Sequence, residues 1–390
     1  MGDDLTYYEF FAGGGMARAG LGSNWRCLFA NDFSAAKVSA YVDNWGNDHI
    51  HLGDVELVKT SQLPGRAAMA WASFPCQDLS LAGAYAGLGE VGAKMTRSGT
   101  FWHFWSLIKG LLREGRKPET IVLENVFGAL TSRGGADFVA ISNALAAGGY
   151  RFGAVVIDAV HFVPQSRARV FFVAVDASAP LPDALVRGVP SPVWHPVALT
   201  RAQNLLKGHA RDSWLWWNMP QPPTREVSLV DVIEAAPADV QWHSTVETER
   251  MLAMMSEVNR QKVISAQQAG GLSVGAVYRR TRPDKNGVKQ QRAEVRFDGV
   301  AGCLRTPGGG SSRQTIIVVE PGSIRSRLLS SREAARLMGL PESYKMPRRY
   351  NEAYHLAGDG VCVSVVRFLA EVVLEPLAVA RHETQTIAAE

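Results

Sequence analysis

The sequence lacks the features that mark secreted, membrane-spanning or disordered proteins. Its 390 residues include only four cysteines, and no two of them have the spacing of a zinc site or a disulfide framework. No apolar run is long enough to cross a bilayer, and the acidic start Met1-Gly2-Asp3-Asp4 is unlike a signal peptide. We therefore expect a protein of a reducing cytoplasm that binds no metal and contacts no membrane.

Charged residues are few, at 20% against 46% hydrophobic residues, so the chain can bury an ample core. The length allows one large domain and a smaller one. The net charge of +4 is spread unevenly. The window from Arg279 to Arg296 contains seven basic and two acidic residues, a net charge of +5, so the rest of the chain sums to −1. Such a window is either a solvated surface or a face that contacts phosphates.

The first half alternates short apolar runs with helical patterns, which predicts an α/β fold with a mostly parallel sheet and helices on both faces. Residues 7–11 form a β-type run, a glycine-rich turn follows at 12–15, and a helical pattern begins at Met16. Strand, glycine-rich turn and helix open a nucleotide-binding unit, although three glycines alone also fit a simple tight turn.

Two carboxylates follow the next two strand patterns. Asp32 stands after the run 26–30, where it suits a contact with a ribose hydroxyl, with the start of the next helix, or with both. Asp54, in Gly53-Asp54-Val55, suits a hydrogen bond from an adenine amino group, and alone it would be interpreted as a turn residue.

The next apolar run, at 69–72, leads into Pro75-Cys76-Gln77. Proline cannot donate to a sheet ladder, so we expect a strand that ends in a loop. The loop would hold Cys76 at the rim of the sheet, where side chains take part in chemistry. The alternative is a buried thiol that packs as a small apolar group. The segment 83–99, rich in glycine and alanine, suggests an active-site loop.

Later strands also carry polar groups. The apolar run 121–126 contains Glu124, a carboxylate that is costly to bury unless it is paired or protonated. In the run Val163–Val173, Arg167 and Arg169 alternate, which would place both on one face of a strand. They would either face an anionic partner or lie in solvent at a sheet edge.

The α/β rhythm stops near residue 180. We place a catalytic and cofactor-binding domain at 1–185, a smaller irregular domain at 186–344, and a C-terminal helix that returns to the first domain at 345–390. Tryptophans and prolines cluster between 194 and 223, and we interpret the tryptophans as packing groups rather than as groups that stack on bases.

These pieces, in this order and spacing, resemble the DNA (cytosine-5) methyltransferase family of the bacterial, single-chain type over residues 7–374. Pro-Cys-Gln, Glu-Asn-Val and Gln-x-Arg-x-Arg are highly specific as an ordered set, whereas each alone is not. The motifs are Phe11-Ala12-Gly13-x-Gly15, Asn31-Asp32-Phe33, Gly53-Asp54-Val55, Pro75-Cys76-Gln77, Glu124-Asn125-Val126, Gln165-x-Arg167-x-Arg169, Arg332-Glu333-x-Ala335-Arg336-Leu337-Met338-Gly339 and Gly358-x-Gly360-Val361.

The resemblance implies a Rossmann-like, S-adenosylmethionine-dependent methyltransferase with a target-recognition domain. It would methylate carbon-5 of a cytosine flipped out of a specific duplex DNA sequence, releasing S-adenosylhomocysteine. Cys76 would add to carbon-6 of the ring. Glu124, protonated because its apolar strand raises its pKa, would hydrogen-bond ring nitrogen 3. Arg169, with Arg167 nearby, would hold the cytosine carbonyl oxygen and help to orient Glu124.

The resemblance also implies which residues bind cofactor and DNA. The S-adenosylmethionine pocket would consist of Phe11, Gly13, Gly15, Asp32, Phe33, Asp54, Val55, Phe74 and Pro75. The DNA would contact Gln77, Ser80, Gln165, Arg279, Arg280, Lys285, Lys289 and Arg313. We expect a monomer in a bacterial cytoplasm, associated with the nucleoid. A cognate restriction endonuclease, acting separately, would complete a restriction-modification pair.

Three positions depart from the usual family pattern and bear on the cofactor contacts. Met16 stands for a second glycine, Asp32-Phe33 for Glu-Trp, and Asp359 for Asn. Two other functions are compatible with the same motifs: a tRNA cytosine-5 methyltransferase, and a catalytically inactive DNA-binding relative. The long segment between Arg169 and Leu304 favours DNA as the substrate, and the intact catalytic trio argues against an inactive relative.

Overall fold

The structure is a computed structural model that describes residues 5–75, 99–283, 287–306 and 313–381, together with the backbone of two short strands, β5 (Glu90–Val91) and β6 (Lys94–Met95). The chain divides into two compact units. Unit 1 consists of Met1–Asp158, Ala168–Pro222 and Val365–Glu390, and unit 2 of Ala159–Arg167 and Pro223–Ser364.

Unit 1 is built on a seven-stranded sheet with the order β3-β2-β1-β4-β7-β9-β8. Neighbouring strands from β3 to β7 are parallel, and β9 runs antiparallel to both of its neighbours. The carboxyl ends of the parallel strands therefore meet at one edge, as the mostly parallel prediction requires. The strands are β1 (Thr6–Phe10), β2 (Arg26–Asp32), β3 (Ile50–Leu52), β4 (Met69–Ala72), β7 (Thr120–Val126), β8 (Tyr150–Asp158) and β9 (Ala168–Asp176).

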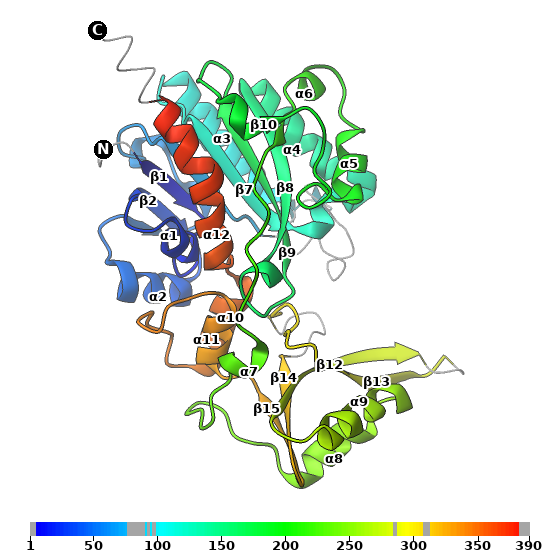
Figure 1. Cartoon of the computed structure of the whole chain (residues 1–390). Helices are drawn as coiled ribbons and strands as arrows, with labels where there is room; N and C mark the ends of the chain where they lie inside the picture. The colour runs from blue at the N-terminus through cyan, green and yellow to red at the C-terminus, as the bar shows by residue number, and fades with distance from the viewer. Residues whose placement is uncertain are drawn as a thin grey trace. The chain divides into compact units, whose positions relative to one another are not determined.

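Helices cover both faces of this sheet, which confirms the predicted layering. Figure 1 shows α3 and α4 on one face and α12 on the other. The α12 side chain Arg367 donates to the carbonyl oxygen of Leu21 over 2.8 Å, which ties the C-terminal helix to the end of α1. The helices of unit 1 are α1 (Met16–Leu21), α2 (Ala35–Trp45), α3 (Thr100–Arg113), α4 (Ala136–Ala147), α5 (Val197–Gln203), α6 (Gly208–Asp212) and most of α12 (Val363–Leu369), which continues as Ala370–Leu374.

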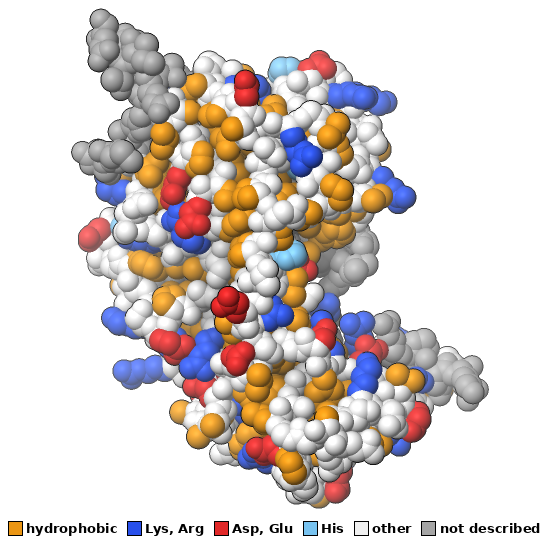
Figure 2. Space-filling view, in the orientation of Figure 1, with side chains coloured by type: hydrophobic (Ala, Val, Ile, Leu, Met, Phe, Trp, Pro, Cys, Tyr) orange, Lys and Arg blue, Asp and Glu red, His pale blue; other side chains and the backbone are white. Residues whose placement is uncertain are grey.

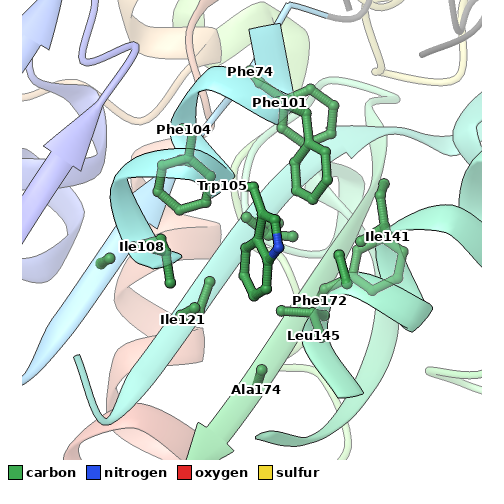
Figure 3. Packing of buried hydrophobic residues seen from close by; sticks show 14 of the residues in the cluster. Phe74, Phe101, Phe104, Trp105, Ile108, Ile121, Ile141, Leu145, Phe172 and Ala174 are labelled. Atoms are coloured by element: carbon green, nitrogen blue, oxygen red, sulfur yellow. The ribbon is translucent and has the colours of Figure 1, made fainter. Parts of the chain in front are cut away.

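The core of unit 1 lies between the sheet and α3 and α4. Side chains at helical spacing on α3, including Phe101, Phe104 and Ile108, are at most 1% exposed because they pack on the apolar face of β4 and β7. Figure 3 shows the ring of Phe101 beside that of Phe74, which follows β4, and Phe172, on β9, belongs to the same cluster. This packing fixes the backbone from which the site residues project.

The boundary between the units differs from the predicted one. We expected the smaller domain to begin at 186, but residues up to Pro222 belong to unit 1. The tryptophans explain the difference, because they pack onto the sheet. Trp217 is fully buried and donates to the carbonyl oxygen of Val173 on β9, and Trp194 is 1% exposed and donates to that of Pro220. The short pair β10 (Val186–Arg187) and β11 (Trp216–Trp217) completes this layer.

Unit 2 is more regular than its composition suggests. An antiparallel sheet has the order β13-β12-β14-β15, and its apolar face packs on α8 and α9 through side chains such as Met251, Val263 and Val277. Its elements are α7 (Leu229–Val232), α8 (Thr245–Ala253), α9 (Glu257–Gln268), β12 (Ser273–Pro283), β13 (Lys289–Arg296), β14 (Thr315–Glu320), β15 (Ser323–Leu328), α10 (Ser331–Leu337) and α11 (Tyr350–Asp359).

Candidate active site

The glycine-rich turn after β1 has an unusual backbone. Phe11, Gly13 and Gly15 all have positive φ angles, of 59°, 56° and 76°. An aromatic residue in this region is strained, and such strain concentrates at ligand sites. At Gly15 a side chain is also excluded, because a Cβ would lie 2.4 Å from Nε1 of Trp45. The same indole donates to the carbonyl oxygen of Gly14 over 3.1 Å, so Trp45 holds the turn in place.

Asp32, at the end of β2, closes this turn. One carboxylate oxygen accepts the backbone N–H of Gly13 over 2.9 Å, and the other accepts that of Ser34 over 2.8 Å. The carboxylate is 5% exposed. Its neighbour Phe33 has a ring that is 69% exposed, which is unusual for an aromatic side chain. The arrangement offers a carboxylate and a flat apolar surface next to a glycine turn, which fits the ribose and base of a nucleoside.

The end of β3 is fastened to the same edge. The amide of Asn31 donates to the carbonyl oxygens of His51 and Gly53, over 3.1 and 2.9 Å. Asp54 is exposed, and one of its carboxylate oxygens accepts the N–H of Glu56 over 3.0 Å, which caps a short 3₁₀ turn at Val55–Leu57. Asp54 therefore has the turn role that was the alternative to an adenine contact, and Val55 packs inward at 4% exposure.

Glu124 and Arg169 form an ion pair across β7 and β9. The distance from Arg169 Nε to Glu124 Oε1 is 3.3 Å, and the two side chains are only 14% and 10% exposed. The antiparallel register sets this pair, because Arg169 lies opposite Val126 and Phe171 opposite Glu124. A guanidinium held against a carboxyl at the carboxyl end of a strand can orient that carboxyl toward a substrate.

Asn125 links this pair to the loop after β4. It is 2% exposed, and its amide donates to the carbonyl oxygen of Phe74 over 3.1 Å. Phe74 is itself buried, at 3% exposure. Because β4 and β7 are parallel neighbours, Phe74 and Pro75 follow β4 at the edge where Glu124 lies. Cys76, Gln77 and Ser80 come next in the chain and lie outside the described residues.

Arg167, the other arginine of the alternating pair, has a different set of partners. β9 begins at Ala168, so Arg167 precedes the strand and belongs to unit 2. We expected the two arginines to share one face of a strand, and they do not. Arg167 is 3% exposed and donates to the carbonyl oxygens of Gly358 and Gly360, over 3.0 and 2.6 Å. It therefore holds the motif at 358–361 in place.

Gln165 is fully buried. Its amide donates to the carbonyl oxygen of Leu337 over 2.7 Å and accepts the N–H of Leu304 over 3.1 Å. These bonds give it a positioning role within unit 2, and a direct contact with DNA would require them to break.

Sequence reasoning missed Glu9 on β1. The side chain is 1% exposed, and no hydrogen-bond partner is found for its Oε2 among the described residues. The pKa of Glu9 is raised to about 8, chiefly by burial, with Arg18 acting to lower it and the charge of Asp32 adding to the rise. Glu9 lies on the strand that leads into the glycine turn. The sequence does contain a signal for Glu9, because a carboxylate inside the apolar run 7–11 is as costly to bury as Glu124 is in its strand.

The cationic side chains expected to contact DNA lie in unit 2. Arg279, Arg280 and Lys289 are exposed on β12 and β13, and Lys285 lies outside the described residues. Arg313 donates to Asn351 and lies over the Tyr350 ring, 5.5 Å from its centre. On the face shown in Figure 2, basic and acidic side chains are interspersed.

In the described part of the chain, no three histidine, cysteine or acidic side chains gather as metal ligands would. Among the described residues, no helix is both long and apolar enough to span a membrane.

The parallel sheet, the glycine turn and the polar side chains at its carboxyl edge define an α/β enzyme of the Rossmann-like type. The family model "C-5 cytosine-specific DNA methylase" matches residues 5–375, so the chain belongs to that family of DNA-modifying enzymes. It is 24% identical to the type II methyltransferase M.NlaX of Neisseria lactamica, over 93% of this chain and 94% of that protein. It is 23% identical to M.HhaI of Haemophilus parahaemolyticus, over 94% and 93%.

Solved structures share the fold at low sequence identity. The S. pombe Dnmt2 methyltransferase has a TM-score of 0.56 at 17% identity, covering 96% of this chain and 99% of that one. A putative DNA modification methyltransferase encoded within an E. coli prophage has a TM-score of 0.55 at 16% identity, covering 95% and 99%. The recognition made from the ordered motifs is confirmed by the family match.

Proposed function

We propose that this protein transfers a methyl group from S-adenosylmethionine to carbon-5 of a cytosine in duplex DNA, with Cys76 as the nucleophile. The observation that carries the proposal is the pair of Glu124 and Arg169 at the end of β7, joined through Asn125 to the loop that leads to Cys76. Addition to a pyrimidine ring needs an acid for the ring nitrogen, a role that the carboxyl of Glu124 would fill, and a nucleophile, a role that the thiol of Cys76 would fill.

The residues after β1, β2 and β3 support the choice of cofactor. S-adenosylmethionine supplies an activated methyl group. Asp32 would accept hydrogen bonds from the ribose hydroxyls, and the exposed Phe33 ring would stack on the adenine. Asp54 would accept a hydrogen bond from the amino group of the adenine. Phe11, Gly13, Gly15, Val55, Phe74 and Pro75 would form the remaining walls, since all of them are found in the turns after β1, β3 and β4.

The reaction steps follow from the chemistry of the ring. The Cys76 thiolate forms a bond to carbon-6 while Glu124 donates a hydrogen bond or proton to nitrogen 3, so that carbon-5 becomes nucleophilic. Carbon-5 then takes the methyl group, and the electron pair of the broken sulfur–methyl bond stays on S-adenosylhomocysteine. Loss of the carbon-5 proton to solvent, return of the nitrogen 3 proton to Glu124 and departure of the thiolate restore the ring. The target base must leave the duplex to reach these groups.

The test is methyl transfer from isotope-labelled S-adenosylmethionine to duplex DNA and, in parallel, to tRNA. We expect labelled 5-methyldeoxycytidine from the DNA, none from the tRNA, and none with the Cys76→Ala variant. Label in tRNA alone would favour the RNA alternative. Binding of duplex DNA without transfer to either substrate would favour an inactive DNA-binding protein.

A further inference from the structure

Two aromatic side chains of α2 pack on the glycine turn. A Cβ added at Gly15 would lie 2.4 Å from Nε1 of Trp45 and 2.9 Å from the ring of Tyr41, so both rings contact this glycine closely. The Trp45 indole also donates to the carbonyl oxygen of Gly14 over 3.1 Å. The shape of the turn therefore depends on where these two rings lie.

Arg18, on α1, lies over both rings. Its Cζ atom is 5.0 Å from the centre of the Trp45 ring and 5.8 Å from that of the Tyr41 ring. A cation within about 6 Å of an aromatic ring centre is attracted to the ring, and the attraction grows where water is excluded. Nη1 of Arg18 also donates to the Tyr41 hydroxyl over 3.0 Å, which fixes the guanidinium against α2.

His49, in the segment between α2 and β3, is a further partner of the guanidinium. Its Nε2 is bonded to Nη1 of Arg18 and lies 3.0 Å from the Tyr41 hydroxyl. Arginine has donors and no acceptor, so Nε2 must accept, and the imidazole must be uncharged with its proton on Nδ1. Burial, together with the charge of Arg18, lowers the pKa of His49 from its ordinary value of 6.5, so the ring is uncharged at neutral pH.

The other ionisable groups of this cluster come from the strands and from the chain next to His49. Asp48 favours protonation of His49, but less than burial and Arg18 oppose it. Burial raises the pKa of three groups: Glu9 to about 8, the Cys27 thiol to about 12, and Tyr7 well above its usual range. These three keep their protons between about pH 5 and 7, so titration of His49 changes the charge next to Arg18 in this range.

We propose that Arg18 is a positioning residue for the cofactor, which holds the Trp45 and Tyr41 rings against the glycine turn as long as His49 is uncharged. This inference rests on the proposed function, because that function gives the turn its S-adenosylmethionine. Protonation of His49 would remove the acceptor for Arg18 and place a second positive charge beside it. Affinity for the cofactor should therefore be complete above pH 6.5 and decline as the pH falls through the lowered pKa of His49.

The experiment measures S-adenosylhomocysteine binding by calorimetry from about pH 7.5 to about pH 5. Arg18→Met removes the charge and keeps the length of the side chain, whereas Arg18→Lys keeps the charge without the planar fork. His49→Gln keeps an acceptor but cannot take up a proton.

Arg116→Lys is the matched control. Arg116 also fastens part of unit 1, because it donates to the carbonyl oxygens of Thr60, Leu63 and Gly65. These carbonyls precede β4, whereas the glycine turn follows the parallel strand β1, so the control lies at the opposite end of the sheet. Arg116→Lys should lower the thermal unfolding midpoint without changing the affinity for S-adenosylhomocysteine.

At neutral pH, Arg18→Met should weaken binding by roughly 5- to 30-fold, which is what one hydrogen bond and one cation–π contact supply. Arg18→Lys should restore part of the loss. The decline in affinity below pH 6.5 should appear in the wild type and in Arg116→Lys, and it should be absent from His49→Gln and Arg18→Met.

Turnover separates positioning from general stability. The duplex used contains the site that the wild type methylates, mapped by bisulfite sequencing. Arg18→Met should raise KM for S-adenosylmethionine in proportion to the loss of binding. It should leave kcat within about twofold, since the lost support acts on the ground state and the transition state alike.

Two results would overturn this inference alone. One is wild-type affinity in Arg18→Met with a lower unfolding midpoint, which would mean that Arg18 only stabilises the fold. The other is an unchanged pH dependence in His49→Gln, which decides the matter even if Arg18→Met does not fold. A wild-type protein that binds no S-adenosylhomocysteine would overturn the cofactor assignment and this inference together.

Discussion

The amide of Asn125 donates to the carbonyl oxygen of Phe74 over 3.1 Å, so the strand that carries Glu124 also holds the loop that leads to Cys76. In the proposed mechanism Glu124 and Cys76 act on one base, and this buried bond joins the strand of Glu124 to Phe74, two residues before Cys76. A nucleophile and an acid gain most from such fixed placement, because misplacement by about 1 Å costs much of the rate.

Substitution of Asn125 tests this connection. Asn125→Ala leaves the buried carbonyl of Phe74 without its donor, and we expect a loss of about 1–3 kcal/mol in the free energy of unfolding. Turnover should fall further than DNA affinity does. The matched control is Asn218→Ala, which removes a similar bond, 2.9 Å long, to the carbonyl oxygen of Ala184 at an exposed position. Equal effects of the two substitutions on turnover would contradict the account.

Glu124→Gln tests the acid. The side chain keeps its shape but cannot give up a proton to nitrogen 3. We expect turnover to fall by about two to four powers of ten, with little change in the dissociation constant for duplex DNA, since general acid help belongs to the transition state. Single-turnover rates and gel-shift titrations measure the two quantities. Near-normal turnover would show that the ring needs no acid from this residue.

Gly15→Ala tests the cofactor turn. The new Cβ would meet Trp45 at 2.4 Å and would also sit at a positive φ. Gly134→Ala is the matched control, because Gly134 has φ of 68° and ψ of 20°, in the same left-handed region as Gly15, and no atom within 4 Å of a Cβ. The control should lower the free energy of unfolding only by the cost of a left-handed backbone, about 1–2 kcal/mol. Gly15→Ala should lower the free energy of unfolding by more than the control does. It should also weaken S-adenosylhomocysteine binding, measured by calorimetry. Equal losses with unchanged binding would contradict a cofactor role for the turn.

Glu9 gives a prediction about pH. Its pKa rises from 4.5 to about 8 on folding, so the folded protein keeps a proton that the unfolded chain releases between these values. The contribution of Glu9 to stability is therefore fully present below pH 4.5 and is lost as the pH rises toward 8. Relative to wild type, Glu9→Gln should become more stable as the pH rises from 5 to 8, measured by urea unfolding.

Its control is Glu56→Gln, at an exposed position near the same edge of the sheet, which should show no such trend. A stability difference between wild type and Glu9→Gln that does not change with pH would mean that Glu9 is ionised in the folded protein.

The sequence allowed the local parts of the site to be predicted. The turn at 12–15, the acid after β2 and Glu124 in its strand follow from glycine, strand and burial rules that act over a few residues. The predicted partnership of Arg169 with Glu124 came from the family resemblance, and the structure shows it at 3.3 Å. The roles of the remaining cofactor and DNA residues stay predictions.

Long-range contacts could not be predicted in the same way. Gln165 and Arg167 look like substrate ligands in the sequence, yet each bonds backbone groups more than 130 residues away. The tryptophans from 194 to 217 interrupt the α/β pattern, but they pack on β8 and β9, which moved the boundary between the units to residue 222. Such partners are set by the fold as a whole, and no local pattern encodes them.

The most direct test of the central claim is a trap for the covalent intermediate. Duplex DNA with 5-fluorocytosine at the mapped target site is incubated with the protein and S-adenosylmethionine. Fluorine cannot leave as the carbon-5 proton does, so the account predicts a protein–DNA adduct that survives denaturation. Mass spectrometry of its peptides should locate the bond at Cys76. Cys76→Ala should give no adduct while still binding S-adenosylhomocysteine. An adduct formed by Cys76→Ala, or one located at another residue, would contradict the account.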